Sequence, residues 1–202
     1  QVLKKKGVTR VSVNPQTLSD EVLCRIGRNH TVEDFFQAYQ TAKAVGLEIN
    51  VDLIAGLPGE DADAFSAGFR EILSLAPENI TLHTLYIKRA AAFGMEDTAA
   101  AFTKQGDQAG KMVEFARKQC REAGYFPYYL YRQKNTVGNH ENVGYTRPGK
   151  ESLYNIYMMD DLQPIWGIGA NAVSKIISNE GRVYRTYNTK FAYNYLKEDL
   201  KC

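Results

Sequence analysis

The residues best suited to chemistry lie at or near the carboxyl ends of predicted strands. Asp52 lies in the apolar segment 49–54, where a carboxylate is costly to bury unless it is paired or accepts hydrogen bonds. Two interpretations stay open: Asp52 binds a ligand amine or hydroxyl, or it forms a salt bridge to Arg28 or Arg10. Gln16 follows the first strand and offers both a donor and an acceptor, although a loop glutamine is usually just solvated.

Glycine-rich segments and basic residues give weaker signals. Segment 56–59, Gly-Leu-Pro-Gly, lets a backbone approach a flat ligand closely, but such clusters also mark ordinary turns. Segment 167–172 has G-x-G spacing without the third glycine and flanking elements of a dinucleotide site. Basic side chains available to recognise carboxylates, most of which are expected to be solvated, are Lys88, Arg89, Arg132, Lys134, Arg147, Lys150 and Lys175.

Histidines and cysteines are few and widely separated. They share no metal-ligand spacing and no C-x-x-C motif, and no Ser-His-Asp or Cys-His arrangement stands out. We therefore predict no metal ligand in this chain and name no catalytic residue. The residues in question are His30, His83 and His140, with Cys24, Cys120 and Cys202.

The composition describes an ordinary folded chain. Its 202 residues are 44% hydrophobic and 24% charged. Twenty-five Lys and Arg against 23 Asp and Glu leave a net charge of +2, too small and too evenly spread for a nucleic-acid partner. No run of 18 apolar residues and no apolar signal core occur, so we expect no membrane association and a cytoplasmic location.

The elements that position these residues alternate along the chain. Strand patterns, rich in β-branched residues or apolar throughout, are separated by helical patterns at intervals of about 30 to 40 residues, which is typical of βαβ crossovers and a parallel sheet. Both an open doubly wound sheet and a barrel fit. Ligands in such sheets bind beyond the carboxyl ends of the strands. The predicted strands are 8–13, 49–54 and 80–87, and the predicted helices are 32–45, 65–76 and 108–123, with Thr31 as the cap of the first and Gly46 after its end.

Both ends of the chain differ from this pattern. Residues 1–7 are typical of the last turn of a helix, so we expect the chain to enter its fold partway through a helix-to-strand unit; a frayed arm is the alternative. Beyond Gly124 an aromatic extended segment leads into a Gly- and Asn-rich tract that runs to Tyr145. We therefore divide the chain into residues 1–124 and a smaller mixed region, 125–202, that packs on the first and covers the substrate.

Several segments together carry a family likeness. They resemble the second half of the radical S-adenosylmethionine (SAM) barrel in the oxygen-independent coproporphyrinogen III oxidases, also called coproporphyrinogen dehydrogenases. The D-L-I-x-G-L-P block that follows G-x-x-R-x-H-T is fairly specific. The segments are 8–17, 20–23, 27–31, 50–59, 128–135, 141–145 and 167–174.

The resemblance implies a fold and a reaction. The fold is α/β: the C-terminal half of a (β/α)₆ partial TIM barrel, followed by a small mixed α/β region. The family binds a [4Fe–4S] cluster through a C-x₃-C-x₂-C loop and SAM at the open iron. Reductive cleavage of SAM yields a 5′-deoxyadenosyl radical that takes a hydrogen from a substrate propionate. The propionate radical then loses CO₂ and an electron and becomes a vinyl group. Two such rounds convert coproporphyrinogen III to protoporphyrinogen IX in haem biosynthesis, and an external electron donor supplies the electron for the reductive cleavage of SAM.

The resemblance also assigns roles to single residues, according to their positions in the matching segments. The resemblance implies polar SAM contacts, an adenine contact, a strand-end backbone contact to the cofactor, and a C-terminal residue that reaches back toward the site. For the propionates of the substrate, we expect arginines at the mouth of the pocket. The implied polar SAM contacts are Gln16, Arg28 and Asp52, and the implied adenine contact is Ile54. Tyr86 would supply the strand-end backbone contact, and Val173 would reach back toward the site. The arginines expected for the substrate are Arg89 and Arg132.

Two departures from the family pattern shape the prediction. The cluster cysteines are not in this sequence, and Asn14-Pro15 stands where relatives often have Gly-Val. We therefore predict a C-terminal fragment that holds part of the SAM pocket, needs the missing N-terminal half of the barrel as its partner, and is inactive alone. Two alternatives stay open: a haem-binding or haem-insertion chaperone of the same family, and a radical SAM enzyme acting on another substrate.

Overall fold

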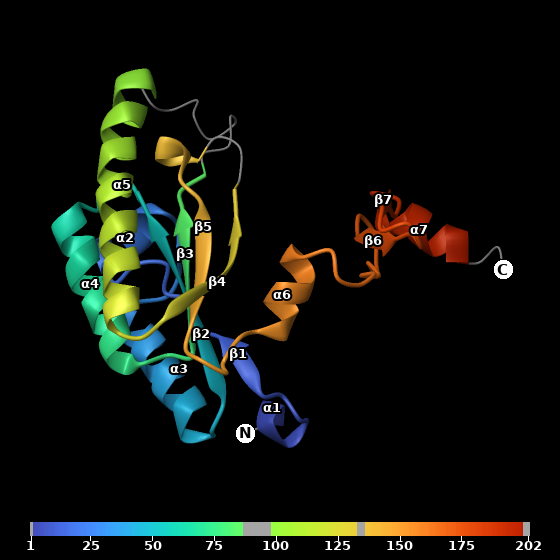
Figure 1. The fold of residues 1–202 in the computed structure, drawn as a ribbon, viewed down its shortest axis with the longest axis horizontal. Coiled ribbons are helices and arrows are strands. Elements are labelled where there is room, and N and C mark those ends of the chain that lie inside the picture. Colours follow the sequence, from blue (N-terminus) through green and yellow to red (C-terminus); the bar gives the residue numbers. More distant parts are fainter. Residues whose placement is uncertain (1, 87–97, 133–135, 200–202) are drawn as a thin grey trace. The chain divides into compact units, whose positions relative to one another are not determined.

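A computed structural model describes residues 2–86, 98–132 and 136–199, with the side chains of 98–105 excepted. The chain divides into two compact units, one ending at Glu151 and the other beginning at Ser152. The first unit is built on a five-stranded sheet of order β1-β2-β3-β5-β4 (Figure 1). Each unit is described by itself below.

The first three strands are parallel, as the βαβ pattern predicts. β1 (Arg10–Ser12) pairs with β2 (Glu48–Ala55), and β2 pairs with β3 (Asn79–Thr84). The register places Asp52 opposite Thr81 and Ile54 opposite His83. The carboxyl ends of three strands therefore meet at one edge of the sheet.

Local capping chemistry sets the ends of the connecting helices. In α3 (Val32–Ala44), Thr31 and Asp34 form a reciprocal capping box, so the predicted start is confirmed. The Asp61 side chain caps α4 (Ala62–Leu75), which ends at Ala76 with φ 54°. Pro77 follows, and proline cannot continue a helix. The other helices of this unit are α1 (Val2–Lys5), α2 (Asp20–Arg25) and α5 (Thr98–Glu122).

The third crossover helix is longer than the sequence pattern predicts. We expected it to begin near residue 108, whereas α5 begins at Thr98. Its added N-terminal part contains the run 99–101 of alanines, good helix formers that carry no apolar periodicity to reveal them.

The other half of the sheet is antiparallel. β4 (Phe126–Tyr131) coincides with the aromatic segment predicted to be extended, whereas β5 (Asn142–Thr146) and the antiparallel pairing were not predicted. β5, with the short η2 turn (Val137–Asn139) before it, falls largely in the Gly- and Asn-rich tract, in which the sequence pattern predicted no strand. β5 pairs antiparallel with both β3 and β4, so it lies inside the sheet. Glycine within a strand often marks the close approach of another group, and Gly144 meets the ring of Tyr129 in this way.

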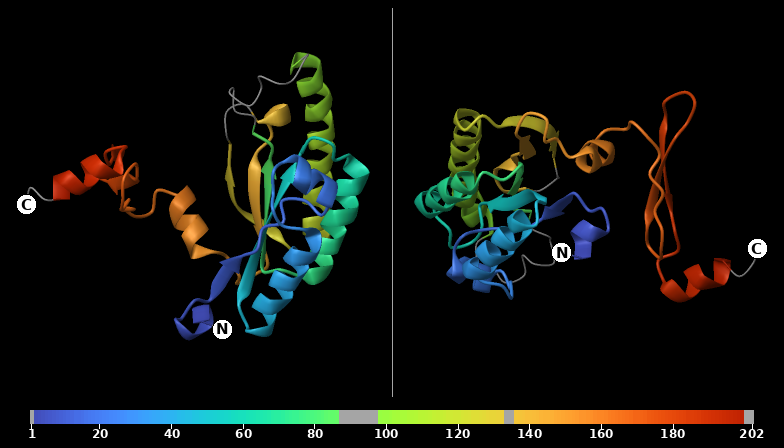
Figure 2. Two further views of the ribbon diagram at one scale, coloured as in Figure 1. Left: turned by 180° about the vertical axis from the view of Figure 1, so that it is seen from behind. Right: turned by 90° about the horizontal axis from the view of Figure 1, so that it is seen from below.

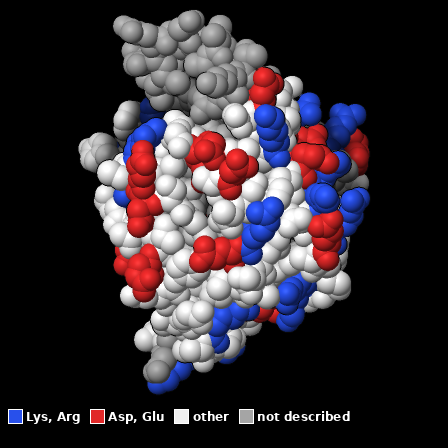
Figure 3. Space-filling model, turned by 90° about the vertical axis from the view of Figure 1, so that its left-hand side faces the viewer, with Lys and Arg blue, Asp and Glu red and all other residues white. Residues whose placement is uncertain are grey.

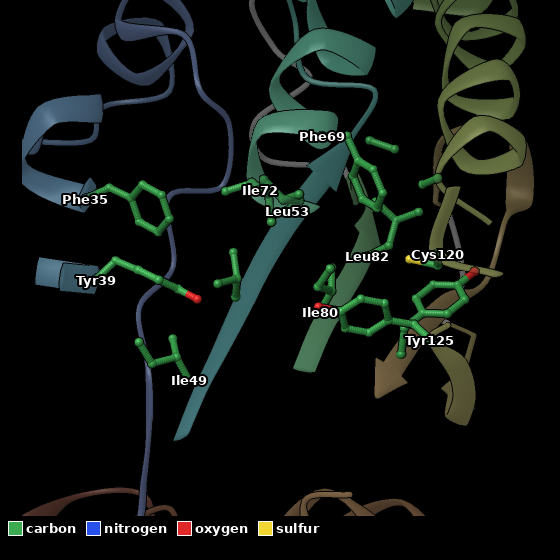
Figure 4. Packing of buried hydrophobic residues seen from close by; sticks show 14 of the residues in the cluster. Phe35, Tyr39, Ile49, Leu53, Phe69, Ile72, Ile80, Leu82, Cys120 and Tyr125 are labelled. Atoms are coloured by element: carbon green, nitrogen blue, oxygen red, sulfur yellow. The ribbon is translucent and has the colours of Figure 1, made fainter. Parts of the chain in front are cut away.

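The two faces of the sheet differ in chemistry. Helices α3, α4 and α5 cover one face in all three ribbon views (Figures 1 and 2). Ile49, Val51 and Ile80 are fully buried and belong to one hydrophobic cluster with Phe69 and Ile72 of α4. Figure 4 shows part of this cluster. Alternate residues of the same strands point to the opposite face. On the helical side of the molecule, acidic and basic side chains are interspersed (Figure 3).

Replacing Gly144 by alanine should destabilise the first unit by about 1–3 kcal/mol, the usual cost of overpacking. The backbone of Gly144 is not left-handed, so the cost is purely steric: a Cβ would overlap the Tyr129 ring. Tyr129 would then lose its contact with Thr81, whose Oγ1 lies 3.0 Å from the tyrosine hydroxyl. Denaturant unfolding measures the change.

A double-mutant cycle controls for this steric explanation. In a Tyr129→Ala background no ring opposes the added methyl group, so Gly144→Ala should then have little further effect. An equal loss in both backgrounds would show that the ring is not the cause.

The second unit is a small mixed region that begins at Ser152, whereas the sequence pattern placed the division after Gly124. It contains α6 (Leu153–Met159), the antiparallel hairpin β6 (Val173–Ile177) and β7 (Val183–Tyr187), and α7 (Ala192–Asp199). No helix in the described ranges combines the length and apolar character needed to cross a bilayer.

Candidate functional site

A row of polar side chains lies on the sheet face opposite the helices. In β2, residues 49, 51, 53 and 55 are buried under the helices, which places Asn50, Asp52 and Ile54 on the other face. The same alternation in β3 places Thr81 and His83 there. A parallel strand covered on both faces would be apolar throughout, so this polar face is a candidate binding surface.

Asp52 lies at the centre of the hydrogen-bond network on this surface. Its Oδ2 accepts a hydrogen bond from Asn14 Nδ2 at 2.9 Å and lies 3.5 Å from His83 Nε2. Its Oδ1 accepts from Asn50 Nδ2 at 2.7 Å. The backbone N–H of Asp52 also donates to Asn14 Oδ1 at 3.2 Å. Oδ2 is therefore held from both sides of β2, by Asn14 after β1 and by His83 on β3, and Oδ1 by Asn50 of the same strand.

These contacts keep the carboxylate ionised. Burial alone raises the pKa of Asp52, but hydrogen bonds from His83, Asn50 and Thr81 lower it below its ordinary value. Neither salt-bridge partner suggested by the sequence is the one found. Arg10 pairs with Glu48 at 2.6 Å, and the partner of Asp52 is His83.

The network continues in two directions from Asp52. The second nitrogen of His83, Nδ1, lies 3.1 Å from the hydroxyl of Tyr131 on β4. Asn50 accepts from Thr81 Oγ1 at 3.2 Å, and Thr81 contacts Tyr129. Polar groups thus connect β4 to the end of β1 across the sheet.

Gln16 and Ile54 lie beside Asp52. Gln16 is 8% exposed, so the solvated loop glutamine considered from sequence is wrong. Its backbone N–H donates to the carbonyl of Asp52 at 3.2 Å, and its carbonyl accepts from Ile54 N–H at 2.9 Å. These bonds hold Gln16 in the left-handed region, at φ 71°. The structure therefore brings Gln16, Asp52 and Ile54 together, and their role in binding stays a prediction.

The other predicted cofactor residues lie on other elements of the chain. Arg28 is exposed between α2 and α3, and Tyr86 lies just past β3 in an isolated bridge with Thr136. Val173 begins β6 in the second unit and pairs with Tyr187. Their predicted roles remain untested.

Of the two predicted substrate arginines, one is described. Arg132 directly follows β4, is exposed, and pairs with Glu141 at 3.3 Å. Arg89 lies outside the described residues, as do Lys88 and Lys134.

Structural roles account for three other predicted cations. Lys175 is 8% exposed and its Nζ contacts the carbonyls of Tyr157 and Asp160 and the carboxylate of Asp161. The Lys150 Nζ lies 2.7 Å from Glu48. Arg147 lies over the ring of Tyr125.

Both glycine segments are explained by packing. A Cβ on Gly56 would lie 3.1 Å from Ala109 of α5, and one on Gly59 would overlap the guanidinium of Arg25. In the second segment the Asn188 side chain donates to the carbonyls of Gly167 and Gly169 at 3.2 and 2.9 Å. The close backbone approach expected at these glycines is therefore to the protein itself.

A buried glutamate was missed in the sequence. Glu60 accepts a hydrogen bond from Thr17, which is 2% exposed, and this bond joins the loops that follow β1 and β2. Burial raises the pKa of Glu60 to about 7; the Thr17 bond opposes this and the charge of Asp61 adds to it. Its Oε2 is buried without a hydrogen-bond partner among the described residues.

The two cysteines that the structure describes do not fit an iron–sulfur cluster. Burial raises the pKa of Cys120 to about 12, which disfavours the thiolate that a cluster requires. Cys24 is exposed on α2, and Cys202 lies outside the described residues. Among the described residues, no group of three His, Cys, Asp or Glu is arranged to hold a metal ion.

A signal for the missed site residues was present in the sequence. Polar residues recur every second position in otherwise apolar strands, as in Asn50 and Asp52 or Thr81 and His83. This period marks a face turned away from the core. Which polar residues meet across strands depends on register, which the pattern does not contain.

Comparison with known proteins gives consistent matches. A family model described as the radical SAM superfamily matches residues 1–70. The chain is 42% identical over 211 residues to the "Oxygen-independent coproporphyrinogen-III oxidase-like protein HemZ" of Bacillus subtilis (strain 168), covering 99% of this chain and 42% of that protein. It is 26% identical to the "Heme chaperone HemW" of Escherichia coli (strain K12), covering 96% of this chain and 47% of that protein.

A solved structure shares the fold. The coproporphyrinogen III oxidase HemN from Escherichia coli, described as a radical SAM enzyme, matches with a TM-score of 0.66 at 18% identity, over 98% of this chain and 45% of that one. The chain therefore spans less than half the length of each of these three proteins.

Proposed function

Because the chain belongs to the radical SAM superfamily, we propose that the polar cluster at the carboxyl ends of β1 and β2 is its share of a SAM-binding site. The observation that carries this proposal is the ionised carboxylate of Asp52, held by Asn14, Asn50 and His83 beside the buried Gln16. Such a carboxylate accepts hydrogen bonds from hydroxyl or ammonium groups.

The residues present fit SAM in kind. Asp52 supplies an acceptor for ribose hydroxyls or the amine, and Gln16 supplies an amide. Ile54, on the same face as Asp52, supplies an apolar contact for the adenine ring. Arg28 is an exposed cation suited to the carboxylate of methionine. The cluster would be held by residues outside the described part of this chain, because its described cysteines do not fit one.

For the reaction, we propose the oxidative decarboxylation of coproporphyrinogen III to protoporphyrinogen IX by the complete polypeptide. SAM bound beside a reduced [4Fe–4S] cluster supplies the hydrogen abstraction that this reaction needs. The chain's own residues bind and orient SAM, and Arg132 binds a substrate propionate. The similarity to the HemZ oxidase-like protein supports this assignment.

Replacing Arg132 by alanine should raise the KM for coproporphyrinogen III about tenfold, the loss of one charge-assisted hydrogen bond. The kcat should change less than KM, because the proposed role of Arg132 is to bind the substrate. The assay uses the complete polypeptide with a reconstituted cluster, SAM and a reductant without oxygen, and follows protoporphyrinogen IX and CO₂.

Arg117 is the matched control for this experiment. It is also exposed and paired, with Glu114 at 2.8 Å, but it lies on α5, on the helical side of the sheet. Arg117→Ala should leave KM unchanged. Equal KM values in the Arg132→Ala variant and the wild type would remove Arg132 from the substrate site, and no turnover by the wild type would reject the proposed reaction.

A haem chaperone is the second candidate, supported by the similarity to the HemW proteins. The same preparation distinguishes the two functions. Haem bound at one equivalent, with no conversion of coproporphyrinogen III, favours the chaperone. Conversion without stoichiometric haem binding favours the oxidase.

A further inference from the structure

Three side chains form a line across the polar face, one from each of β2, β3 and β4. Asp52 Oδ2 lies 3.5 Å from His83 Nε2, and His83 Nδ1 lies 3.1 Å from the hydroxyl of Tyr131. The side chains of Asp52 and His83 are 21% and 27% exposed, so both are largely shielded from water. The rings of His83 and Tyr131 also meet edge to face, with centroids 6.3 Å apart.

Asp52 and Tyr131, on either side of His83, determine which nitrogen of its imidazole carries the hydrogen. An ionised carboxylate only accepts, so the Nε2 that faces Asp52 carries the hydrogen. Burial, and then the charge of Asp52, raise the pKa of Tyr131, so its hydroxyl keeps its proton and donates to Nδ1. The Nε2–H form is the one neutral tautomer of His83 that satisfies both contacts.

We propose that His83 and Tyr131 are positioning residues for Asp52 in the SAM site, an inference that rests on the proposed function. Tyr131 selects the tautomer and ring orientation of His83, and His83 holds the Asp52 carboxylate ionised and fixed in direction. A partner of a ligand-binding group acts in this way when it sets that group's orientation and charge. Tyr131 immediately precedes Arg132, so one strand end carries both the support for the cofactor carboxylate and the proposed substrate cation.

The first measurement needs no cofactor. In the complete polypeptide without its cluster, ¹⁵N NMR of the imidazole nitrogens should show the Nε2–H tautomer at His83. Tyr131→Phe removes the hydroxyl and should give a mixture of tautomers. Tyr129→Phe, which removes a hydroxyl that contacts Thr81 instead, should leave the tautomer unchanged. An Nδ1–H tautomer in the wild type would overturn the inference.

The second measurement is SAM affinity by calorimetry, in the polypeptide with its cluster reconstituted. His83→Leu and Tyr131→Phe should weaken binding about tenfold, as expected for the loss of support from a hydrogen bond to a charged group. His83→Gln keeps an N–H donor for Asp52 and should stay within about threefold of the wild type. Tyr125→Phe removes a tyrosine hydroxyl outside this network, which donates to the Pro77 carbonyl at 2.6 Å, and should bind SAM like the wild type. Circular dichroism checks that each variant is folded.

The outcomes separate this inference from the proposed function. If Asp52→Asn loses SAM binding while His83→Leu and Tyr131→Phe keep it, the positioning role is wrong and the SAM site stands. If the wild type binds no SAM, or Asp52→Asn binds it normally, the proposed SAM site fails and the positioning role fails with it. If His83→Leu does not fold, His83→Gln and Tyr131→Phe still decide.

Discussion

Asp52→Ala is expected to weaken SAM binding by about one to two orders of magnitude. A hydrogen bond to a charged group contributes about 1.5–3 kcal/mol, and 1.4 kcal/mol corresponds to a factor of ten in affinity. The carboxylate is already ionised and held by Asn14, Asn50 and His83. A ligand can therefore bind to the charged group without any further ordering of the Asp52 side chain. Calorimetry on the complete polypeptide with its cluster reconstituted measures the loss.

Glu48 provides a matched carboxylate for comparison. It lies on the same strand and the same face as Asp52, four residues earlier, which is roughly 13 Å along a strand. Its oxygens pair with Arg10 and Lys150. Glu48→Ala should lower stability slightly and leave SAM affinity unchanged. A similar loss of affinity in both variants would indicate a general effect of removing charge, and unchanged affinity in Asp52→Ala would reject the proposed site.

The parts of the fold that the sequence predicted are those governed by local chemistry. The box of Thr31 and Asp34, the proline after α4 and the β-branched strands act within a few residues, so their pattern is visible in one segment. β5 was missed because Gly144 counts against a strand when it is considered alone. The reason for that glycine is the ring of Tyr129, fifteen residues away, which the segment itself does not contain.

The same distinction holds for the site. Asp52 could be predicted because a carboxylate within an apolar strand needs a partner wherever it lies. The partner could not be named, since the sequence offers Arg10 and Arg28 as readily as His83. The parallel register of β2 and β3 places His83 opposite Ile54, two residues beyond Asp52 on the same face, and so within reach of its carboxylate. Arg10 is occupied by Glu48 at the other end of the sheet.

Glu60→Gln is expected to stabilise the protein at pH 8 by up to about 3 kcal/mol. Burial raises the pKa of Glu60 from 4.5 to about 7 in the folded state, and one pKa unit corresponds to about 1.4 kcal/mol. The folded state therefore binds more protons than the unfolded state between these values. The contribution of Glu60 to stability is full below about pH 4.5 and is lost as pH rises through about 7. Glutamine resembles the protonated carboxyl and removes this loss.

Denaturant unfolding at pH 5, 6, 7 and 8 tests the expectation through the difference between variant and wild type, in which other titrating groups cancel. The difference should be small at pH 5 and grow toward pH 8, because only the wild type then has to ionise a carboxyl that is buried beside Thr17. Glu33→Gln removes a charge from the exposed surface of α3 and controls for net charge. A Glu60→Gln difference that does not vary with pH would mean that the buried carboxyl is ionised throughout, with Oε2 bonded to a group outside the described residues.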